Sequence, residues 1–426
     1  MRPQVACRIC NKRTLVGVLD LGNQAVSDFV ATKRKPILAP LKLVICDGRA
    51  GGCGLVQLAN QGVGRDILYR NYWYRSGINE SMRQSLAAVT ASITKLIPFQ
   101  RGDIVVDIGA NDGTLLGTYQ TPGIVRVAFE PAGNLITAAK KNCELAVNDY
   151  FSASRWSRAV GSAQKAKAIT TVAMFYDLND PNRFVSDLRQ TLAKDGLWVN
   201  EMTYFPEMLT KRAFDTICHE HIEYYTLKPF LKLLKTHALE VVGTLATPVN
   251  GGSLRTYVTH WKNLTYQRFG LKTVKTLLQR EKDLELDTPQ PYLRFKNEID
   301  SLKNKLNGFI KREVSAGKKV AVYGASTKGN TMLQYFELDH KLISFAADRS
   351  PYKWGKQTVA TNIPIVSEVE ARQMKPDYFF VLPWHFRDVF IHRERPYLLA
   401  GGRMIFPIPQ PEIVHMHSGK LITHKI

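Results

Sequence analysis

The sequence predicts an α/β protein in which a small cysteine-bearing module is followed by two doubly wound, Rossmann-like sheets. Strand-like apolar runs alternate with helical patterns between Ile104 and Thr259, and such alternation is typical of a mostly parallel sheet with helices on both faces. A second strand, glycine turn and helix begin at Lys319. Four of the six cysteines lie within the first 53 residues. These three observations indicate the fold class.

The length of the chain implies several domains. A chain of 426 residues is too long for one ordinary core, and its 45% hydrophobic content is that of a globular protein. We therefore expect four consecutive segments: a cysteine module (1–65), a doubly wound domain with a helical lead-in (66–262), a helical connector (263–318) and a second Rossmann-like domain (319–426).

The apolar runs also predict individual strands. In the first doubly wound domain, strands are expected at residues 104–108, 125–130, 168–174, 197–201 and 239–245. Residues 249–259 begin with glycines in a turn and are expected to form a closing β-hairpin. The second Rossmann-like domain is expected to continue with strands at 342–347 and 378–382.

The charge of the chain suits several kinds of partner without selecting one. A formal net charge of +21 fits nucleotides, nucleotide-sugars, nucleic acid or a membrane surface. No helix-turn-helix, RNA-recognition or basic-region pattern accompanies it, so a nucleic-acid partner is disfavoured. No apolar run reaches the roughly 18 residues of a membrane span, and none follows the N-terminal Met1-Arg-Pro-Gln. We expect a cytoplasmic protein without membrane insertion and leave its oligomeric state open, a monomer included.

The clustered cysteines predict a metal site. Cys7-x-x-Cys10 holds two thiolates within reach of one ion, and Cys46 with Cys53 can complete a tetrahedral set. In a reducing compartment such clustering favours a metal over disulfides. Four sulfur ligands leave no vacant position, so the predicted Zn²⁺ is structural. The alternative is a set of free thiols whose spacing is coincidental.

The segment Asp107-Ile-Gly109-Ala-Asn111-Asp112-Gly113 leads from a buried strand through a glycine turn into a helix. Glycine permits both the tight turn and the close approach of a ligand. A dinucleotide is disfavoured, because the carboxylates of Asp107 and Asp112 would repel its pyrophosphate. A sulfonium cofactor that carries an ammonium group suits these acids. The turn therefore predicts S-adenosylmethionine, with an ordinary Rossmann turn that binds nothing as the alternative.

Three side chains further along complete the expected cofactor site. Glu130 ends the next strand, where its carboxylate can accept hydrogen bonds from two ribose hydroxyls. Asp149 and Tyr150 are suited to the amino group and the ring face of adenine. The full expected set is Asp107, Gly109, Asn111, Asp112, Gly113, Glu130, Asp149 and Tyr150.

Ionisable side chains crowd the segment His219-Glu220-His221-Ile-Glu223. Metal ligation by the two histidines is conceivable, but their spacing is not the i, i+4 pair of a helical zinc site. Proton transfer is favoured, because histidine is readily poised as a base near neutral pH and a neighbouring carboxylate can hold its tautomer. A solvated surface loop is the alternative.

The second glycine turn, Gly324-Ala-Ser-Thr-Lys328-Gly-Asn330, carries no acid. Lys328 makes an anionic group at the start of the following helix plausible as a ligand. The alternative is a turn that serves packing alone.

Taken together, these motifs resemble the three-domain sugar C-methyltransferases, which act on nucleotide-linked keto-deoxysugars. The resemblance runs over nearly the whole chain. It is carried by Cys53-Gly-Leu-Val-Gln-Leu58, the turn that starts at Asp107, Asp215-Thr-Ile-Cys-His-Glu-His221, Gly251-Gly-Ser-Leu-Arg255 and Tyr323-Gly-Ala-Ser-Thr-Lys-Gly-Asn-Thr331.

The resemblance implies a structural zinc, a central S-adenosylmethionine-binding methyltransferase sheet and a C-terminal domain that helps to form the sugar-nucleotide cleft. It also implies that a base removes the proton beside a ketone and that the enolate then takes the methyl group in line. By position, His221 is the expected base and Glu220 its partner or an enediolate stabiliser. Tyr72, Tyr74 and Tyr224 are expected to line the cleft. Arg255 or Lys328 is expected to meet a phosphate of the substrate, and Asn330 is also expected to bind the substrate.

The chain differs from the family pattern at two places that bear on the carbon to be methylated. Cys218 stands where a tyrosine is typical, and Met174-Phe-Tyr176 stands near a typical histidine. Tyr176 is expected to supply a hydroxyl in place of the imidazole.

Two other functions remain open from the sequence. One is an O- or N-methyltransferase of a sugar or small metabolite, in which the base deprotonates a heteroatom. The other is a zinc-containing nucleic-acid-binding protein, which predicts a steep salt dependence of binding. The aromatic residues near the cysteines lie in the following helix rather than in a basic patch, which argues against the latter.

Overall fold

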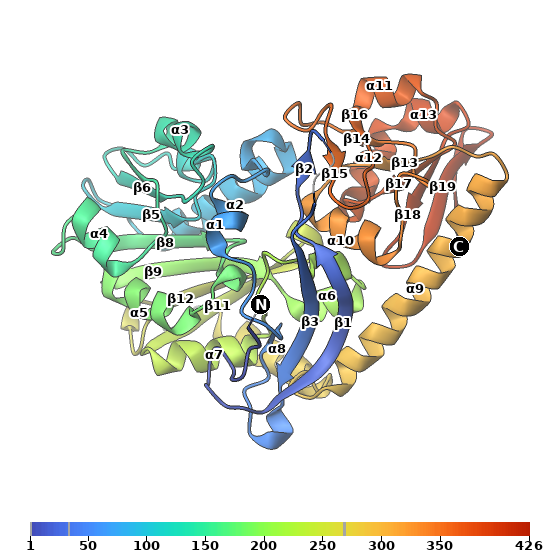
Figure 1. Ribbon diagram of the computed structural model, residues 1–426. Helices are drawn as coiled ribbons and strands as arrows, with labels where there is room; N and C mark the ends of the chain where they lie inside the picture. The colour runs from blue at the N-terminus through green and yellow to red at the C-terminus, as the bar shows by residue number, and fades with distance from the viewer. Residues whose placement is uncertain (1, 33–34, 267–269) are drawn as a thin grey trace. The chain divides into compact units, whose positions relative to one another are not determined.

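The computed structural model describes residues 2–32, 35–266 and 270–426, and its ribbon is shown in Figure 1. Two compact units share these residues. The first unit comprises Met1–Val16, Val44–Pro206 and Ile222–Pro289, and the second comprises Gly17–Leu43, Glu207–His221 and Gln290–Ile426. This division differs from four consecutive segments, because the cysteine module, the connector and the His-Glu-His region are each divided. Residues 1, 33–34 and 267–269 of the expected module and connector lie outside the described residues.

A seven-stranded sheet forms the centre of the first unit. Its strand order is β11-β12-β9-β8-β5-β6-β7. The parallel strands are β5 (Ile104–Ile108), β6 (Val125–Phe129), β7 (Leu145–Val147), β8 (Ala166–Val172) and β9 (Leu192–Thr203). β12 (Ser253–His260) runs antiparallel between β9 and β11 (Leu239–Thr247). The order reverses between β5 and β8, and ligands of doubly wound sheets bind at the carboxyl ends of the strands at such a switch point.

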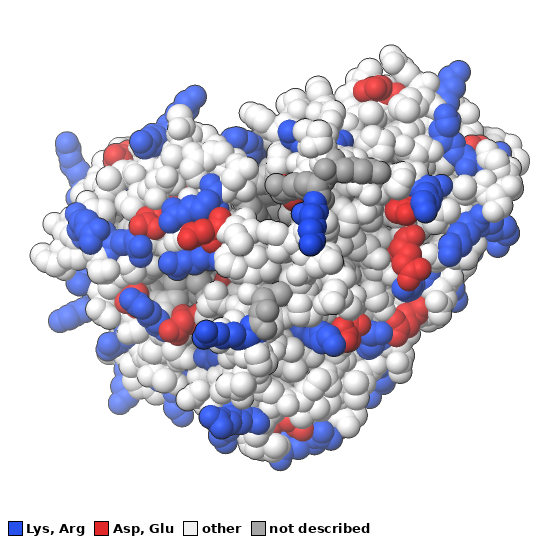
Figure 2. Space-filling model, in the orientation of Figure 1, with Lys and Arg blue, Asp and Glu red and all other residues white. Residues whose placement is uncertain are grey.

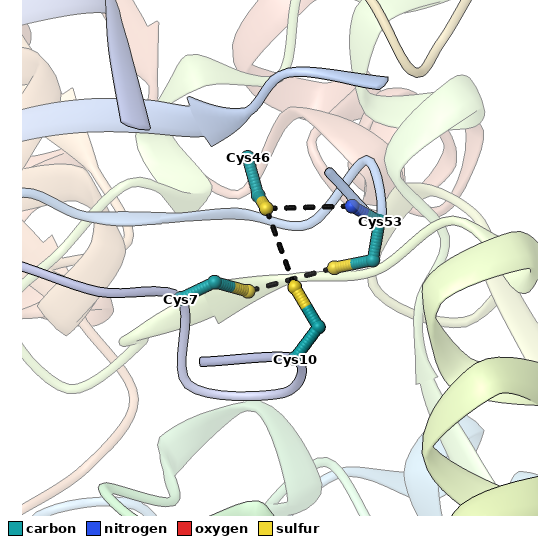
Figure 3. A group of neighbouring side chains, drawn as sticks. All are labelled: Cys7, Cys10, Cys46 and Cys53. Atoms are coloured by element: carbon teal, nitrogen blue, oxygen red, sulfur yellow. Dashed lines mark hydrogen bonds between the residues drawn. The ribbon is translucent and has the colours of Figure 1, made fainter. Parts of the chain in front are cut away.

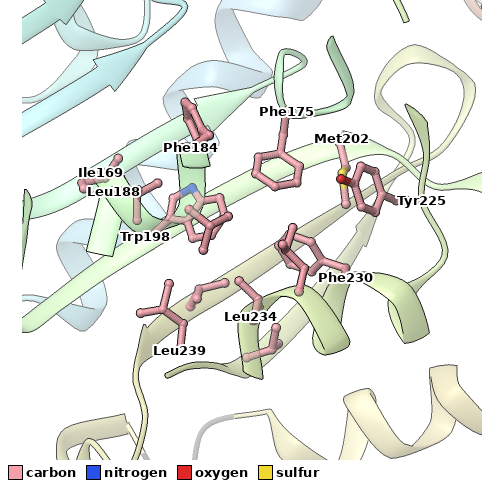
Figure 4. Close-up of a cluster of buried hydrophobic side chains, with 14 of the residues drawn as sticks. Ile169, Phe175, Phe184, Leu188, Trp198, Met202, Tyr225, Phe230, Leu234 and Leu239 are labelled. Atoms are coloured by element: carbon pink, nitrogen blue, oxygen red, sulfur yellow. The ribbon is translucent and has the colours of Figure 1, made fainter. Parts of the chain in front are cut away.

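Alternating side chains of the central strands pack against helices on opposite faces of this sheet. Val105 belongs to a core with Val89 and Ile93 of α2 (Glu80–Leu96). Val106 belongs to the other core, which is filled from α4 (Ala153–Ala159), α5 (Pro181–Thr191) and α7 (Leu227–Thr236). Figure 4 shows part of that second core, including Trp198, Phe230 and Leu239. Strands buried on both faces explain the continuous apolar runs in the sequence.

The expected strands of this sheet are present with shifted ends, and the hairpin differs from the prediction. Residues 249–259 do not form a hairpin by themselves, because Val249–Gly251 is a 3₁₀ turn and the following residues form the single strand β12. The partner of β12 in the hairpin is β11, with Thr247 opposite Ser253. The sequence also gave no signal for the short strand β7.

A small sheet accompanies the cysteines, with the order β1-β3-β4-β10. β1 (Leu15–Ala25) and β3 (Leu38–Cys46) contribute residues to both units, whereas β4 (Val56–Leu58) and β10 (Glu223–Tyr224) lie in the first. β4 pairs with β10 in antiparallel register, so that Val56 lies opposite Tyr224.

The second unit contains another seven-stranded sheet, in the order β16-β14-β13-β17-β18-β19-β20. Its parallel strands are β13 (Val320–Tyr323), β14 (Ala346–Asp348), β16 (Ile365–Ser367), β17 (Tyr378–Val381) and β18 (Arg403–Phe406). β19 (Glu412–His417) and β20 (Lys420–Lys425) extend it antiparallel. A further pair in this unit joins β2 (Phe29–Val30) to β15 (Gln357–Thr358). The switch point of the seven-stranded sheet lies between β13 and β17.

The remaining helices surround these sheets. In the first unit they are α1 (Arg65–Tyr69), α3 (Ile136–Ala139) and α8 (Leu271–Asp283). α6 (Phe205–Thr210) begins in the first unit and ends in the second. The second unit has α9 (Gln290–Ser315), α10 (Thr327–Tyr335), α11 (Glu368–Gln373), α12 (Arg387–Arg393) and α13 (Arg395–Leu399). Across the described ranges, no helix combines the length and the apolarity needed to cross a bilayer.

Candidate functional site

The glycine turn after β5 lies at the carboxyl edge of the first sheet, at its switch point. Gly109 has φ +75° and Gly113 has φ +77°, a region that glycine adopts most readily. A Cβ on Gly113 would lie 2.9 Å from Cα of Ala139. The turn is therefore compact as well as left-handed, which explains the glycines at these positions.

Glu130 follows β6 and holds this turn from the neighbouring strand. Its Oε2 accepts a hydrogen bond from the amide of Asn111 at 2.7 Å, and its Oε1 accepts one from the amide of Ala132 at 2.7 Å. Burial raises the pKa of Glu130 to about 7, and the nearby Asp112 adds to that effect. The carboxylate retains lone pairs for further donors such as ribose hydroxyls.

Asp107 is buried at the end of β5. Its Oδ1 accepts a hydrogen bond from the hydroxyl of Thr170 at 2.6 Å, and burial raises its pKa to about 7. Asp107 and Glu130 are thus two buried carboxyl groups at this edge, and their negative charges are poorly solvated. A cationic ligand at this edge would compensate that cost.

The segment before α2 is bound to the turn through the two other polar residues predicted there. The amide of Gly77 donates to Oδ2 of Asp112 at 2.8 Å, and the amide of Ser76 donates to Oδ1 of Asn111 at 3.0 Å. Nδ2 of Asn111 in turn donates to the carbonyl of Tyr74 at 3.1 Å. These bonds place the Tyr74 backbone beside the turn.

The two tyrosines expected to bind substrate lie in that same segment. The amide of Tyr72 donates to Oδ1 of Asn134 at 3.0 Å, and Asn134 donates back to the Tyr72 carbonyl at 2.9 Å. Tyr74 is 39% exposed. The segment is thus tied through its backbone both to the turn after β5 and to the loop after β6.

Asp149 and Tyr150 follow β7 at the same edge. Asp149 accepts a hydrogen bond from Nε of Arg155 at 2.5 Å, and the hydroxyl of Tyr150 donates to Asp66 at 3.0 Å. The guanidinium of Arg65 lies 4.0 Å from the centre of the Tyr150 ring. The residues predicted for the cofactor therefore lie at one edge of the first sheet, Asp107 near the end of β5 and the others on the loops that follow the strands.

The four predicted metal ligands converge in the first unit (Figure 3). Their sulfur atoms all lie within 4.8 Å of one another. Sγ of Cys7 is 3.5 Å from Sγ of Cys53, and Sγ of Cys10 is 3.5 Å from Sγ of Cys46. Tetrahedral zinc with Zn–S bonds of about 2.3 Å requires S–S separations of about 3.8 Å. The four thiols fit such an ion, and an amide directed at Cys46 from Cys53 at 3.3 Å suits a thiolate.

His219 and His221 both lie in the second unit and are buried. Nδ1 of His221 is 2.7 Å from the carbonyl of Thr216, and since a carbonyl only accepts, Nδ1 carries the proton. Nε2 of His221 therefore carries the lone pair. Nε2 of His219 is 3.0 Å from the carbonyl of Ala39, which assigns it the opposite tautomer. Of these two histidines, His221 is the one whose Nε2 carries the lone pair.

Burial dominates the electrostatics of this segment. It lowers the pKa of His221 to about 3, with a further decrease from the charge of Lys328. It also raises the pKa of Glu220, which Lys328 opposes. The sequence led us to expect a histidine poised near neutral pH with a carboxylate that holds its tautomer. At Nδ1, a main-chain carbonyl has that role instead.

Lys328 is the centre of a group of ionisable side chains in the second unit. Its charge acts on Asp215, Glu220, His221 and His385. Among the described residues it makes no ion pair within 4.0 Å. Asn330, in the first turn of the same helix α10, is 1% exposed, and neither polar atom of its amide has a hydrogen-bond partner in the described part of the chain. The first turn of α10 thus carries a cation with no ion pair among the described residues and an unsatisfied buried amide, and a polar ligand would satisfy both groups.

Asp215 and His385 are members of this group that the sequence did not single out. The only sequence signal for His385 is its place in Leu382-Pro-Trp-His-Phe386, directly after strand β17. Asp215 begins the segment Asp215-Thr-Ile-Cys-His-Glu-His221, whose histidines give the stronger sequence signal. Charge elsewhere is less focused, since Figure 2 shows basic side chains mixed with acidic ones over the visible face.

Three other predicted residues have mainly internal contacts. Tyr176 and Tyr224 are each 5% exposed in the first unit, where the ring of Tyr224 packs 5.5 Å from that of Phe205. Arg255 is 3% exposed, and its Nε donates to Glu201 at 2.6 Å. The expectation that Arg255 meets a substrate phosphate is not supported, because its guanidinium is buried and already neutralised.

The fold and the acidic turn define an S-adenosylmethionine-dependent methyltransferase. Residues 78–244 match the family model of a methyltransferase domain, and residues 248–409 match that of a C-methyltransferase C-terminal domain. The C-methyltransferase NovU of Streptomyces niveus is 28% identical over 422 residues, which cover 98% of this chain and 99% of that protein. The chain belongs to the multi-domain C-methyltransferases.

Solved methyltransferase structures align with part of the chain. Mitomycin 7-O-methyltransferase is 13% identical over 43% of this chain and 55% of its own, with a TM-score of 0.33, so the alignment spans about half of its length. Magnesium protoporphyrin IX methyltransferase from Synechocystis PCC 6803, solved with bound SAH, is 12% identical over 43% of this chain and 88% of its own, with a TM-score of 0.35.

Proposed function

We propose that this C-methyltransferase acts in the cytoplasm on a nucleotide-linked keto-deoxysugar and methylates the carbon beside the ketone through an enolate. The observation that carries the proposal is the tautomer of His221. Because Nδ1 donates to the Thr216 carbonyl, Nε2 is a proton acceptor held in one orientation inside a buried, charged group. A base so oriented suits abstraction of a carbon-bound proton.

The first unit would hold the cofactor. Asp107, Asp112 and Glu130 supply the negative charge that a sulfonium and an ammonium group require, and the backbone of the Gly109 turn permits close approach. Asp149 and Tyr150 would contact the adenine. Tyr72 and Tyr74, on the segment tied to this turn, would line the space in front of it.

The second unit would supply the proton-transfer groups. Nε2 of His221 takes the proton, the electrons of the C–H bond form the enolate double bond, and the carbonyl electron pair moves to oxygen. Bound S-adenosylmethionine would supply an electrophilic methyl group to the enolate carbon, and the electron pair of the broken C–S bond would remain on sulfur. The carbonyl re-forms in that step, and His221 keeps the proton until solvent removes it.

The low pKa of His221 is compatible with this role. Proton transfer converts a neutral imidazole and a neutral ketone into an imidazolium and an enolate, so the net charge of the buried group does not change. Lys328 disfavours the imidazolium but would stabilise the enolate oxygen or a phosphate, and Glu220 would act as the partner of the imidazolium or stabilise the enediolate. Asn330 would hydrogen-bond the substrate, and the hydroxyls of Tyr224 and Tyr176 are proposed to assist the reaction.

A structural Zn²⁺ in the cysteine cluster is part of the proposal. Cys7, Cys10, Cys46 and Cys53 form a closed set of four sulfurs, so such an ion would have no position for substrate. Its role would be to fix the short chain segments around it. β4, which pairs with β10, begins at Val56, shortly after Cys53.

The test is a mass-spectrometric screen of nucleotide-linked 4-keto-sugars with S-adenosylmethionine, for a gain of one methyl group. We expect a C-methylated product, and enzyme-dependent deuterium exchange at the carbon beside the ketone when S-adenosylhomocysteine replaces the methyl donor. A methyl ether formed without exchange would instead identify an O-methyltransferase. Unchanged exchange in His221→Ala would remove His221 from the mechanism.

A further inference from the structure

His385 lies where the second sheet reverses its strand order. Strands β13 and β17 are parallel neighbours. Lys328 and Asn330 lie after β13, and Trp384 and His385 lie after β17. The loops that follow the two strands therefore meet at one edge. This geometry is the usual place for a ligand in a doubly wound sheet.

The two loops are in tight contact. A Cβ on Gly324 would lie 2.5 Å from Cγ of Pro383, and a Cβ on Gly329 would lie 2.5 Å from Cδ1 of Leu382. The amide of Leu382 also donates to the Tyr323 carbonyl at 3.1 Å. The loop that carries His385 is thus fixed against the first turn of α10.

A third segment fixes the residue next to His385. The indole nitrogen of Trp384 donates to Oδ2 of Asp215 at 3.2 Å. The segment that begins at Asp215 continues to Glu220 and His221 in the same unit. His385 is therefore positioned by the element that also carries the proposed base.

His385 can donate a hydrogen bond in its neutral form. Burial, together with the charge of Lys328, lowers its pKa to about 3, so that the ring is neutral at physiological pH. A neutral imidazole always carries one N–H. Among the described residues, no hydrogen bond of either ring nitrogen of His385 is found, and its ring lies beside those of Trp384 and Phe386.

We propose that His385 is a catalytic hydrogen-bond donor, and that its N–H, together with the ammonium of Lys328, binds the carbonyl oxygen of the substrate and stabilises the enolate oxygen. The proposal rests on the function proposed above. A neutral imidazole can polarise a carbonyl without competing for the proton that His221 removes. The proposal thus assigns acceptance of the proton to His221 and donation of a hydrogen bond to His385.

The experiment compares His385→Leu with His385→Gln. Both replace the ring by a side chain of moderate size, but only glutamine retains an N–H donor. The rate of deuterium exchange beside the ketone is measured with the keto-sugar nucleotide and S-adenosylhomocysteine. We expect a decrease of about 100-fold or more in His385→Leu, the usual effect of removing one such donor, and recovery of at least about tenfold in His385→Gln.

Three controls separate this proposal from a structural role and from the function itself. Exposed His392 on α12 gives the matched variant His392→Leu, which should exchange at the wild-type rate. S-adenosylhomocysteine affinity and thermal unfolding should be the same in all variants, and exchange should keep the wild-type pH profile in His385→Gln. Equal exchange in His385→Leu and wild type, or equal loss in both His385 variants, overturns the proposal. Absence of exchange in the wild type defeats the proposed function instead.

Discussion

The guanidinium of Arg255 and the carboxylate of Glu201 form an ion pair with an Nε–Oε2 distance of 2.6 Å, in which each side chain is 3% exposed. Nη1 of Arg255 also donates to the carbonyl of Ala88 at 3.1 Å. The pair thereby joins two neighbouring strands, β12 and β9, to helix α2. Its burial makes it a structural element of the first unit rather than a phosphate-binding group.

Glu201→Gln is expected to destabilise the protein strongly. Removal of the carboxylate leaves the Arg255 charge buried without compensation, which costs about 3–5 kcal/mol. Chemical denaturation measures the effect. The matched control is Asp195→Asn, because the Lys167–Asp195 pair is 22% and 58% exposed and should contribute less than about 1 kcal/mol. Equal losses in the two variants would contradict the structural role of Arg255.

Gly113→Ala is expected to reduce both stability and cofactor binding. The substitution strains a backbone with φ +77° and places Cβ 2.9 Å from Cα of Ala139. Gly102→Ala is the control, since Gly102 has φ +91° but no atom within 4 Å of its added Cβ. Backbone strain of about 1–3 kcal/mol applies to both. Only Gly113→Ala should also weaken S-adenosylmethionine binding in calorimetry; equal affinities would show that the turn does not contact the cofactor.

Cofactor affinity is expected to rise with pH and to level off above about 7. Burial raises the pKa of Glu130 and of Asp107 to about 7, so a cationic ligand must displace protons from them below that pH.

The same pKa shifts affect the stability of the folded protein. The folded protein binds these protons more tightly than the unfolded chain, so this contribution is complete below the unfolded pKa values and is lost as pH rises toward 7.

Calorimetric titrations between pH 5.5 and 8.5 test this dependence. Glu130→Gln should weaken binding by about 10-fold to 100-fold, the effect of losing hydrogen bonds to a charged group, and should flatten the pH dependence. Glu144→Gln is the control, because Glu144 pairs with Arg126 at a side-chain exposure of 45%. An affinity in Glu130→Gln equal to that of the wild type would exclude Glu130 from the cofactor site.

Cys10→Ser is expected to lower the bound zinc and the unfolding temperature together. Loss of one thiolate leaves three ligands for an ion that prefers four in structural sites. The control is Cys143→Ser, since Cys143 is half-buried and lies outside the cluster. Elemental analysis should find one zinc per chain in the wild type and in Cys143→Ser. Zinc-free wild-type protein of unchanged stability would contradict the metal site.

His219→Ala is expected to destabilise the protein while keeping its exchange activity. The substitution leaves the Ala39 carbonyl without its imidazole donor, at a cost of about 1–3 kcal/mol. His221→Gln should show the reverse, with retained stability and loss of deuterium exchange. Thermal unfolding and exchange rates distinguish the two. Loss of exchange in a folded His219→Ala would show that the roles of these histidines are wrongly divided.

Much of the fold follows from local patterns in the sequence. The runs at 104–108 and 125–130 are strands because a buried parallel strand is apolar on both faces, and the glycines of the turn indicate their positive φ. The hairpin predicted at 249–259 is wrong, because a turn signal does not reveal which strand pairs with the residues after the turn. The weakly apolar strand β7 gave no pattern strong enough to detect.

The sequence by itself determined the class of protein: the acids and glycines after β5, the carboxylate after β6 and the four cysteines are each recognisable from short spacings. Only the tertiary structure decided the environment of the ionisable side chains. It placed Arg255 in a buried ion pair, gave His221 a main-chain partner and packed the loop of His385 against the first turn of α10, where Lys328 lies. The physical reason is that burial, tautomer and charge depend on strand order and loop packing, which join residues far apart in the chain.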